Sequence, residues 1–399
     1  MNAIVEIPRT ERQLAKIFVS VAGPALIALV PMAVIPALPQ MATHFANGSD
    51  GAMFAQMVMT APAIFIILAT LVSGWLVERA GRRHVMLASL LAYALSGLGL
   101  MAAPDATTLI VLRLALGFSA GLVMTCSMSM VADFPEGGER ERVLGFASAS
   151  AAALAVVAQL VGGQLVAALG WRGSFWLYAL AVPVLLVAIV GATDVVVAPT
   201  RSAAPKPRLY RRLWPIMVLT MILTIGLFMP GIQGPFLLVG DGVTAPATIG
   251  AVLASYSVAA ALVAVFYGVI GRRLSMQTQI VLACLGMGIG CLLMAWLHQG
   301  ALGFTLSCIV IGAGVGLVEP LTVTLALHRT PAVAHTRAVG ILLSAVFLGQ
   351  FLNPIVVNPL RTSLGDHGSF TTVGLFFLVL AGVTAAGFLK SLTTARSEP

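Results

Sequence analysis

Two charged side chains lie deep within long apolar stretches of this 399-residue sequence, and they are the first candidates for chemistry. Glu319 is the acid and Arg113 the permanent cation placed in this way. A charge costs about 3 kcal/mol in hydrocarbon on insertion scales, so each should face the protein interior or a water-filled cavity. Because burial favours the neutral form of a carboxyl group, Glu319 can take up and release a proton as its exposure changes. The alternatives are a hydrogen bond between helices for Glu319 and a structural role for Arg113.

The surroundings of Glu319 and a few uncharged polar residues extend this set. Gly312 and Gly316 share a helical face with Glu319, and Pro320 cannot donate a hydrogen bond to the Gly316 carbonyl, which predicts a roomy notch beside the carboxylate. Other polar side chains in apolar stretches are candidates to line a substrate cavity, although single amides more often join helices. These candidates are Gln159, Gln233, Tyr256, Gln350 and Asn353.

Nucleophilic catalysis and bound cofactors find little support. Gly117-Phe-Ser119-Ala-Gly121 fits the G-x-S-x-G hydrolase pattern, but that motif needs a strand-turn-helix elbow, and here it lies in an uninterrupted apolar stretch. The four cysteines lie in apolar stretches without metal-like spacing, and no phosphate-binding loop occurs. We therefore expect no enzyme, no cofactor and no metal site.

The composition indicates what positions these residues. Hydrophobic residues make up 59% of the chain, charged residues 9%, and the mean hydropathy is +1.02. A soluble domain carries charge on roughly a quarter of its residues, whereas helices surrounded by lipid need no charged coat. The sequence therefore predicts an integral membrane protein.

Twelve apolar stretches are close to the ~20 residues that a helix needs to cross ~30 Å of hydrocarbon. They are hydrophobic all round and too long for barrel strands, so we expect an all-α polytopic membrane protein with twelve transmembrane helices. The expected spans are residues 16–38, 53–77, 84–103, 107–131, 143–169, 174–192, 213–239, 247–270, 276–297, 301–327, 338–360 and 370–389.

The basic residues indicate the orientation. When the loops are numbered alternately, all but three of the 22 lysines and arginines fall on one side; Arg172 and Arg361 fall on the other and Arg113 within a span. Since basic residues stay cytoplasmic, both termini are expected in the cytoplasm, with the protein multi-pass in the cell (inner or plasma) membrane. The first span is expected to be retained rather than cleaved as a signal peptide. The net charge of +8 then reflects topology and predicts no nucleic-acid partner.

A polar segment divides the chain. Residues 194–212 combine prolines, serine and basic residues, which predicts a cytoplasmic linker between an N-terminal six-helix bundle, 1–193, and a C-terminal one, 213–399. The halves echo each other, since Gly81-Arg-Arg83 recurs as Gly271-Arg-Arg273. We interpret the two bundles as pseudo-symmetric copies of one unit, a construction typical of secondary transporters.

One charged stretch, GWLVERAGRRHVM from Gly74 to Met86, resembles the loop signature that joins the second and third helices of the major facilitator superfamily. Glu78 departs from it, since the family usually has Asp there. Arg113-x-x-x-Gly117-x-x-x-Gly121 is similar to the family's buried-arginine motif. The resemblance implies a cytoplasmic latch between the two halves; the alternative is that these charges only anchor the topology. The latch positions are Gly74, Glu78, Arg79, Gly81, Arg82, Arg83 and Asp133.

The resemblance and the apolar interior together favour a drug- or metabolite-efflux branch of the family. We expect a monomeric secondary transporter in the lipid bilayer that exports a small, lipophilic or weakly charged organic solute by proton antiport. Only the last two glycines of the drug exporters' Gly-Pro-x-x-Gly-Gly pattern are present, at Gly162 and Gly163. Proton-coupled uptake by symport is therefore the main alternative, followed by a membrane hydrolase or a sensor that moves no substrate.

Overall fold

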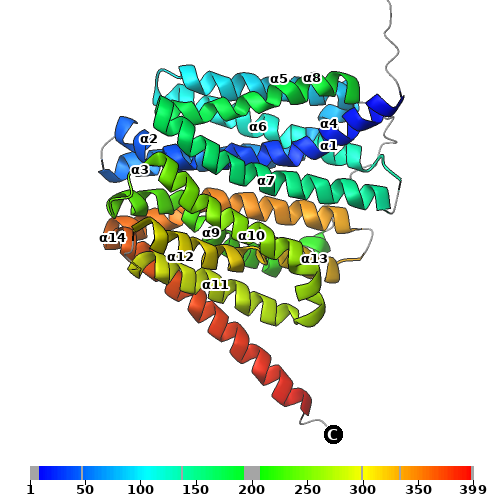
Figure 1. Ribbon diagram of the computed structural model, residues 1–399. Coiled ribbons are helices and arrows are strands. Elements are labelled where there is room, and N and C mark those ends of the chain that lie inside the picture. The colour runs from blue at the N-terminus through cyan, green and yellow to red at the C-terminus, as the bar shows by residue number, and fades with distance from the viewer. Residues whose placement is uncertain are drawn as a thin grey trace, which may run out of the picture. The chain divides into compact units, whose positions relative to one another are not determined.

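The computed structural model describes residues 9–45, 48–135, 138–192, 207–297, 300–331 and 334–396. In these ranges every regular element is a helix, which confirms the all-α prediction. The chain forms two compact units (Figure 1). Unit 1 comprises Met1–Ala37 and Val58–Arg201, and unit 2 comprises Leu38–Met57 and Ser202–Pro399.

The helices follow the expected spans, with several spans built from two pieces. Unit 1 contains α1 (Arg9–Met32), η1 (Ile35–Ala37), α4 (Pro62–Ala80), α5 (Arg82–Gly99), η2 (Leu100–Ala102), α6 (Ala106–Val131), α7 (Gly138–Leu169), η3 (Trp171–Leu180) and α8 (Ala181–Gly191). Unit 2 contains α2 (Leu38–Phe45), most of α3 (Gly48–Thr60), α9 (Pro207–Gly240), α10 (Pro246–Arg273), α11 (Met276–Trp296), α12 (Gly300–Val315), α13 (Val318–His328) and α14 (His335–Arg396).

Eleven helical segments of the described chain are long and apolar enough to cross a membrane, so the protein is a multi-pass membrane protein. The last of them, Arg337–Gly387, contains Gly365 in a non-helical conformation, with φ 75° and ψ 178°, where two helices of α14 meet. Counted separately, these two helices give the twelve spans that the sequence predicts. A positive φ of this kind is open to glycine at little cost, which explains the residue at the bend.

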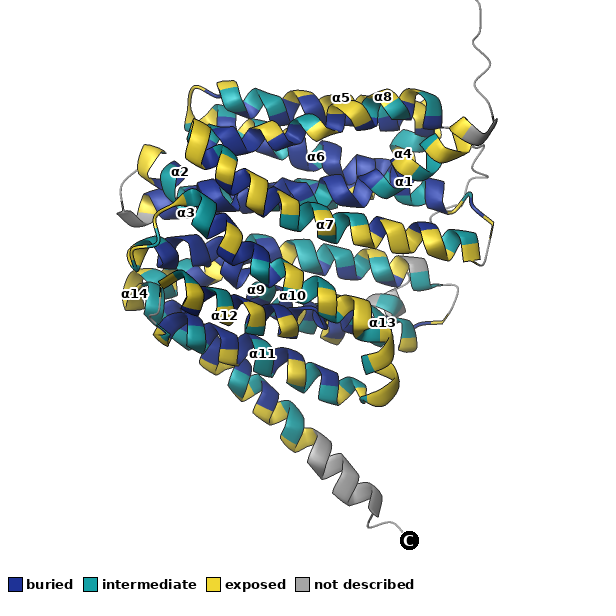
Figure 2. Cartoon of the chain, in the orientation of Figure 1, coloured by how far each residue is buried: buried dark blue, intermediate teal, exposed yellow. Residues whose placement is uncertain are grey.

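The outward surfaces of the helices are apolar. Large side chains such as Leu71, Val265 and Val383 are exposed by 73%, 77% and 65%. Figure 2 shows many exposed positions along α7, interspersed with intermediate and buried ones. No soluble protein leaves so much apolar surface in water, and acyl chains are the natural cover for it.

Paired glycines let helices approach closely in both units. In unit 1, a Cβ on Gly117 of α6 would lie 2.4 Å from the Pro62 carbonyl oxygen of α4, and one on Gly121 would lie 2.7 Å from the Ala69 Cβ. In unit 2, a Cβ on Gly312 of α12 would lie 2.4 Å from the Tyr256 carbonyl oxygen of α10. Small residues at helix contacts are typical of membrane bundles.

Gly316 repeats this arrangement one turn later, since a Cβ there would lie 2.4 Å from the Ala260 carbonyl oxygen. The same glycine spacing therefore packs α6 on α4 and α12 on α10, as expected for two copies of one unit. The glycines at 312 and 316 face the backbone of α10, so these two residues leave no open space on that face.

The segment Leu38–Met57 is grouped with unit 2, although the sequence places it in the N-terminal bundle. Most of the expected linker, residues 194–206, lies outside the described residues. The division of the chain into 1–193, 194–212 and 213–399 therefore stays a prediction.

Candidate functional site

The charged loop between the second and third spans is built on Gly81. Helix α4 ends at Ala80, α5 begins at Arg82, and Gly81 joins them with φ 79° and ψ 147°. This conformation is essentially restricted to glycine. Its amide donates to the Val77 carbonyl at 3.0 Å, which closes α4. The turn places consecutive arginines at the start of α5.

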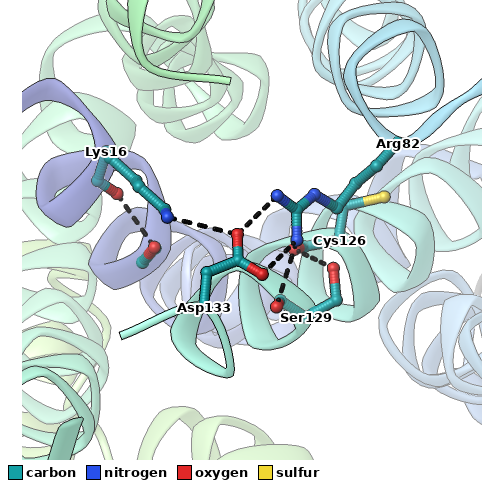
Figure 3. Close-up of polar contacts among 6 residues, drawn as sticks. Lys16, Arg82, Cys126, Ser129 and Asp133 are labelled. Atoms are coloured by element: carbon teal, nitrogen blue, oxygen red, sulfur yellow. Dashed lines mark hydrogen bonds and ion pairs between the residues drawn. The ribbon is translucent and has the colours of Figure 1, made fainter. Parts of the chain in front are cut away.

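Arg82 forms the centre of a buried ionic network in unit 1 (Figure 3). Its Nη1 and Nη2 donate to the two carboxylate oxygens of Asp133 at 3.1 and 2.5 Å, and Nη1 also donates to the Ser129 carbonyl at 3.2 Å. The Arg82 side chain is only 2% exposed. Lys16 Nζ lies 3.2 Å from Asp133 Oδ2, on the opposite side of the carboxylate. One acid just after α6 thereby joins the start of α5 to a lysine two turns into α1.

The electrostatics of Asp133 follow from this geometry. Burial raises the pKa of its carboxyl group, but the hydrogen bonds and charges of Arg82 and Lys16 outweigh burial and hold the pKa below its ordinary value. The two-pronged Arg82 contact is of the strong, charge-assisted kind. Asp133 is therefore ionised at neutral pH and locks the loop to the end of α6.

The contacts that the described structure shows for the other expected latch residues lie elsewhere. Glu78 is exposed and makes no hydrogen bond or ion pair with a described residue. Arg79 is exposed and lies over the Trp75 ring at 4.6 Å, and Arg83 donates to the Ile189 carbonyl at 2.9 Å. Gly74 has open space around it. The structure thus brings Arg82 and Asp133 together and adds Lys16, which the sequence suggested only as the start of a span.

Arg113 is completely buried in unit 1 among aromatic residues. Its Nη1 donates to the Val30 carbonyl at 3.1 Å and to the Tyr178 hydroxyl at 2.8 Å. The guanidinium lies 5.9 Å from the Phe175 ring centre and 5.8 Å from that of Tyr178. Its Nε and Nη2 have no hydrogen-bond partner among the described residues. Carbonyl and aromatic contacts therefore stabilise this cation, and two of its nitrogens remain as unused hydrogen-bond donors.

Glu319 lies at a break in the tenth span. Helix α12 ends at Val315 and α13 begins at Val318, so Glu319 is in the first turn of α13, where its side chain is exposed. Pro320 has no amide hydrogen for the Gly316 carbonyl, which explains why the helix does not continue. A carboxylate in the first turn of a helix is favoured by the helix dipole. The Glu319 carboxylate thus lies at the break between α12 and α13, at the helix terminus whose dipole favours a negative charge.

The amides of unit 2 form a connected and buried cluster. Gln233 Nε2 lies 3.3 Å from Asn353 Oδ1, and Asn353 Nδ2 donates to the Ile225 carbonyl at 2.9 Å. The Tyr256 hydroxyl donates to the Leu227 carbonyl at 2.6 Å. These two carbonyls flank the backbone position that Pro230 leaves without its helical hydrogen bond. The cluster thus supports the proline-bent part of α9.

Gln56 is the member of this cluster that the sequence analysis missed. It is 0% exposed and exchanges two hydrogen bonds with Gln233, at 2.9 and 3.3 Å. It was recognisable as an uncharged polar residue in an apolar stretch, by the criterion that selected the other amides. Gln350 is buried one turn before Asn353 on α14, and Gln159 is buried in unit 1 with its Nε2 3.3 Å from the Met32 sulfur.

The hydrolase pattern has a structural explanation instead. Ser119 donates to the Ala115 and Leu116 carbonyls of its own helix, at 2.9 Å each, and its flanking glycines pack against α4. All four cysteines are buried and free. Among the described residues, no group of three or more His, Cys, Asp or Glu side chains is placed to hold a metal ion.

Comparison with known proteins agrees with this architecture. The profile of the Major Facilitator Superfamily matches residues 21–354. This chain belongs to the Major Facilitator Superfamily. The family's proteins are transporters, so this member is a transporter and not an enzyme.

Two curated relatives of this Major Facilitator Superfamily chain are resistance or efflux proteins. It is 28% identical to the multidrug efflux pump Tap of Mycolicibacterium fortuitum over 87% of this chain and 89% of that one. It is 34% identical to the methylenomycin A resistance protein of Streptomyces coelicolor over 47% of this chain and 36% of that one.

Solved structures share the fold. A D-xylose-proton symporter superposes with a TM-score of 0.74 at 16% identity, covering 93% of this chain and 97% of the other. A POT peptide transporter in complex with sulfate gives a TM-score of 0.75 at 14% identity, covering 96% and 95%. At these identities the likeness establishes the Major Facilitator Superfamily fold and nothing about substrate.

Proposed function

We propose that this transporter exports a small, lipophilic or weakly charged organic solute in exchange for protons. The observation that carries the proposal is the similarity to the efflux pump Tap, which extends over most of both chains. The physical setting agrees with it. The described spans contain few charged side chains, so the interior suits a lipophilic solute better than a sugar or a phosphate.

Glu319 is the proposed proton carrier. It is exposed at the break between α12 and α13, where a small movement of either helix changes its access to water. Broken helices are typical places for ion and substrate sites in secondary transporters. Protonation neutralises the carboxylate and removes its attraction to the first turn of α13, so the two protonation states favour different conformations. Arg113, in unit 1, is proposed as a second residue that takes part in proton coupling or contacts the solute.

The buried amides are the proposed polar contacts for the solute. They are Gln159 in unit 1 and Gln233, Tyr256, Gln350 and Asn353 in unit 2. A solute that reaches them trades its bonds to water for bonds to amides and a phenol, which offer both donors and acceptors. We further propose that the protein works by alternating access, with the charged loop acting as a cytoplasmic latch. Both termini are proposed to be cytoplasmic, and the protein is proposed to be a monomer in the cell membrane.

Proton release from inside-out membrane vesicles tests the proposal. Vesicles with an acid interior receive a chemically diverse panel of solutes while a pH-sensitive dye is recorded. Antiport predicts that some compounds trigger proton release in the wild type and not in Glu319→Gln. Glu141→Gln is the matched control, because Glu141 is an exposed acid outside the proposed latch and the proposed solute contacts.

The outcomes separate the alternatives. Normal coupled transport by Glu319→Gln would reject Glu319 as the carrier. Solute accumulation in whole cells that depends on an inward proton gradient would instead favour uptake by symport.

A further inference from the structure

The segment Leu38–Met57, which we call the crossing hairpin, is packed with unit 2 while the chain on both sides of it belongs to unit 1. It is attached through two breaks in otherwise continuous spans. The first is the short helix η1 at Ile35–Ala37, and the second is the turn at Ala61, between α3 and α4. Both breaks lie within apolar, membrane-spanning segments.

Proline explains why the chain bends at these two places. Pro36 lies within η1 and Pro62 begins α4, and neither can donate the backbone hydrogen bond that would continue the helix before it. The bonds present are of the tighter i to i−3 kind, from the Ala37 amide to the Val34 carbonyl at 2.8 Å and from the Ile64 amide to the Ala61 carbonyl at 3.2 Å. Such breaks are where packed helices bend with least loss of backbone bonding.

The crossing hairpin is held to α9 by a paired amide. Gln56 and Gln233 are 0% and 1% exposed and exchange two hydrogen bonds, and Gln233 also bonds Asn353. The other buried side chains of the described hairpin are apolar, such as Leu38, Met41 and Ala55. The amide pair is therefore the directional contact in an otherwise non-directional interface.

An amide pair suits a contact that must open and close. Its net contribution is small because water replaces both partners when the contact opens. A pair of leucines in the same place would hold more firmly, since opening would expose apolar surface to water.

We infer that the hydrogen-bonded pair of Gln56 and Gln233 is a releasable contact. It holds the crossing hairpin to unit 2 in one conformation, and bonds to water replace it in another. The two proline breaks are the hinges. This inference rests on the transport function and on neither its direction nor its coupling ion, so it can fail while proton-coupled export stands.

The rate at which a water-soluble maleimide labels a cysteine on the buried face of the hairpin tests the inference. Ala52 is buried and lies one turn before Gln56 on the same face of α3, so Ala52→Cys reports release of the hairpin. The purified protein in lipid nanodiscs is labelled, and the parent chain, with its four buried cysteines, sets the background. Ala63→Cys, equally buried in α4 of unit 1, reports general loosening.

The single and double variants have opposite expected results. Gln56→Leu or Gln233→Leu removes both hydrogen bonds of the pair and leaves the remaining amide buried against a leucine, so labelling of Ala52→Cys should rise roughly 5- to 150-fold, as for ~1–3 kcal/mol. The double variant Gln56→Leu/Gln233→Leu should be labelled more slowly than the wild type. Gln279→Leu, which removes a buried amide bonded to the Leu274 carbonyl, should leave the labelling rates of both Ala52→Cys and Ala63→Cys unchanged.

Two results would overturn the inference. One is labelling of Ala52→Cys within twofold of the wild type in both single variants. The other is an equal rise at Ala63→Cys, which would indicate general unfolding. The double variant retains apolar packing, so it keeps the test informative if a single variant fails to fold.

Discussion

Replacing Asp133 should destabilise the folded protein more than replacing its partner Arg82. In Asp133→Asn, Arg82 loses two charge-assisted bonds while its guanidinium stays 2% exposed. Removing one partner of a buried ion pair costs about 3–5 kcal/mol. In Arg82→Gln, Asp133 keeps Lys16 at 3.2 Å and is itself 14% exposed, so the cost should be nearer that of the lost charged hydrogen bonds, about 1.5–3 kcal/mol.

The apparent Tm of the detergent-solubilised protein measures this order. The wild type should have the highest apparent Tm, Arg82→Gln a lower one and Asp133→Asn the lowest. Glu78→Gln, a neighbouring acid without a partner, should match the wild type. An equal loss in the two variants, or the reverse order, would show that burial of Arg82 does not govern the energetics and would refute the reasoning.

The same pair predicts a pH dependence of defined sign. The pKa of Asp133 is lowered in the folded protein, so its stabilising effect is fully present above the ordinary carboxyl pKa of about 3.9 and is lost as the pH falls through the lower folded value. The Tm difference between wild type and Asp133→Asn should therefore be constant near neutrality and shrink only below about pH 4. A difference that shrinks between pH 8 and 6 would contradict this assignment.

Three further predictions test separate parts of the fold. Gly81→Ala should lower the apparent Tm by the equivalent of about 1–3 kcal/mol, because φ is 79° there, whereas Gly74→Ala, with open space around it, should not; equal effects would contradict the turn. His367→Leu should destabilise the protein by about 1–3 kcal/mol, since its ring bonds Asp241 at 2.9 Å, and an unchanged Tm would dismiss this contact. Ser119→Ala should retain transport in vesicles, and its loss would reopen a chemical role for the hydroxyl.

The sequence alone was sufficient for the helical class, the number of spans and the family. These properties follow from local signals, because each span must satisfy its own backbone bonds in lipid and its length is set by the membrane. The charged loop was also visible locally, since Gly81 and its neighbouring arginines stand out in an apolar chain.

The particular partners were decided by tertiary structure. Asp133 meets both Arg82 and Lys16 because α1 and the start of α5 pack at the end of α6. Glu78, which is closer to Arg82 in sequence, makes no ion pair in the described structure. From the sequence, the glycines before Glu319 suggest open space beside the helix. In the structure the backbone of α10 packs against them. Gln56 pairs with Gln233, which lies far along the chain. Side-chain identity defines what a residue can bond, whereas packing of distant helices selects which of those bonds form.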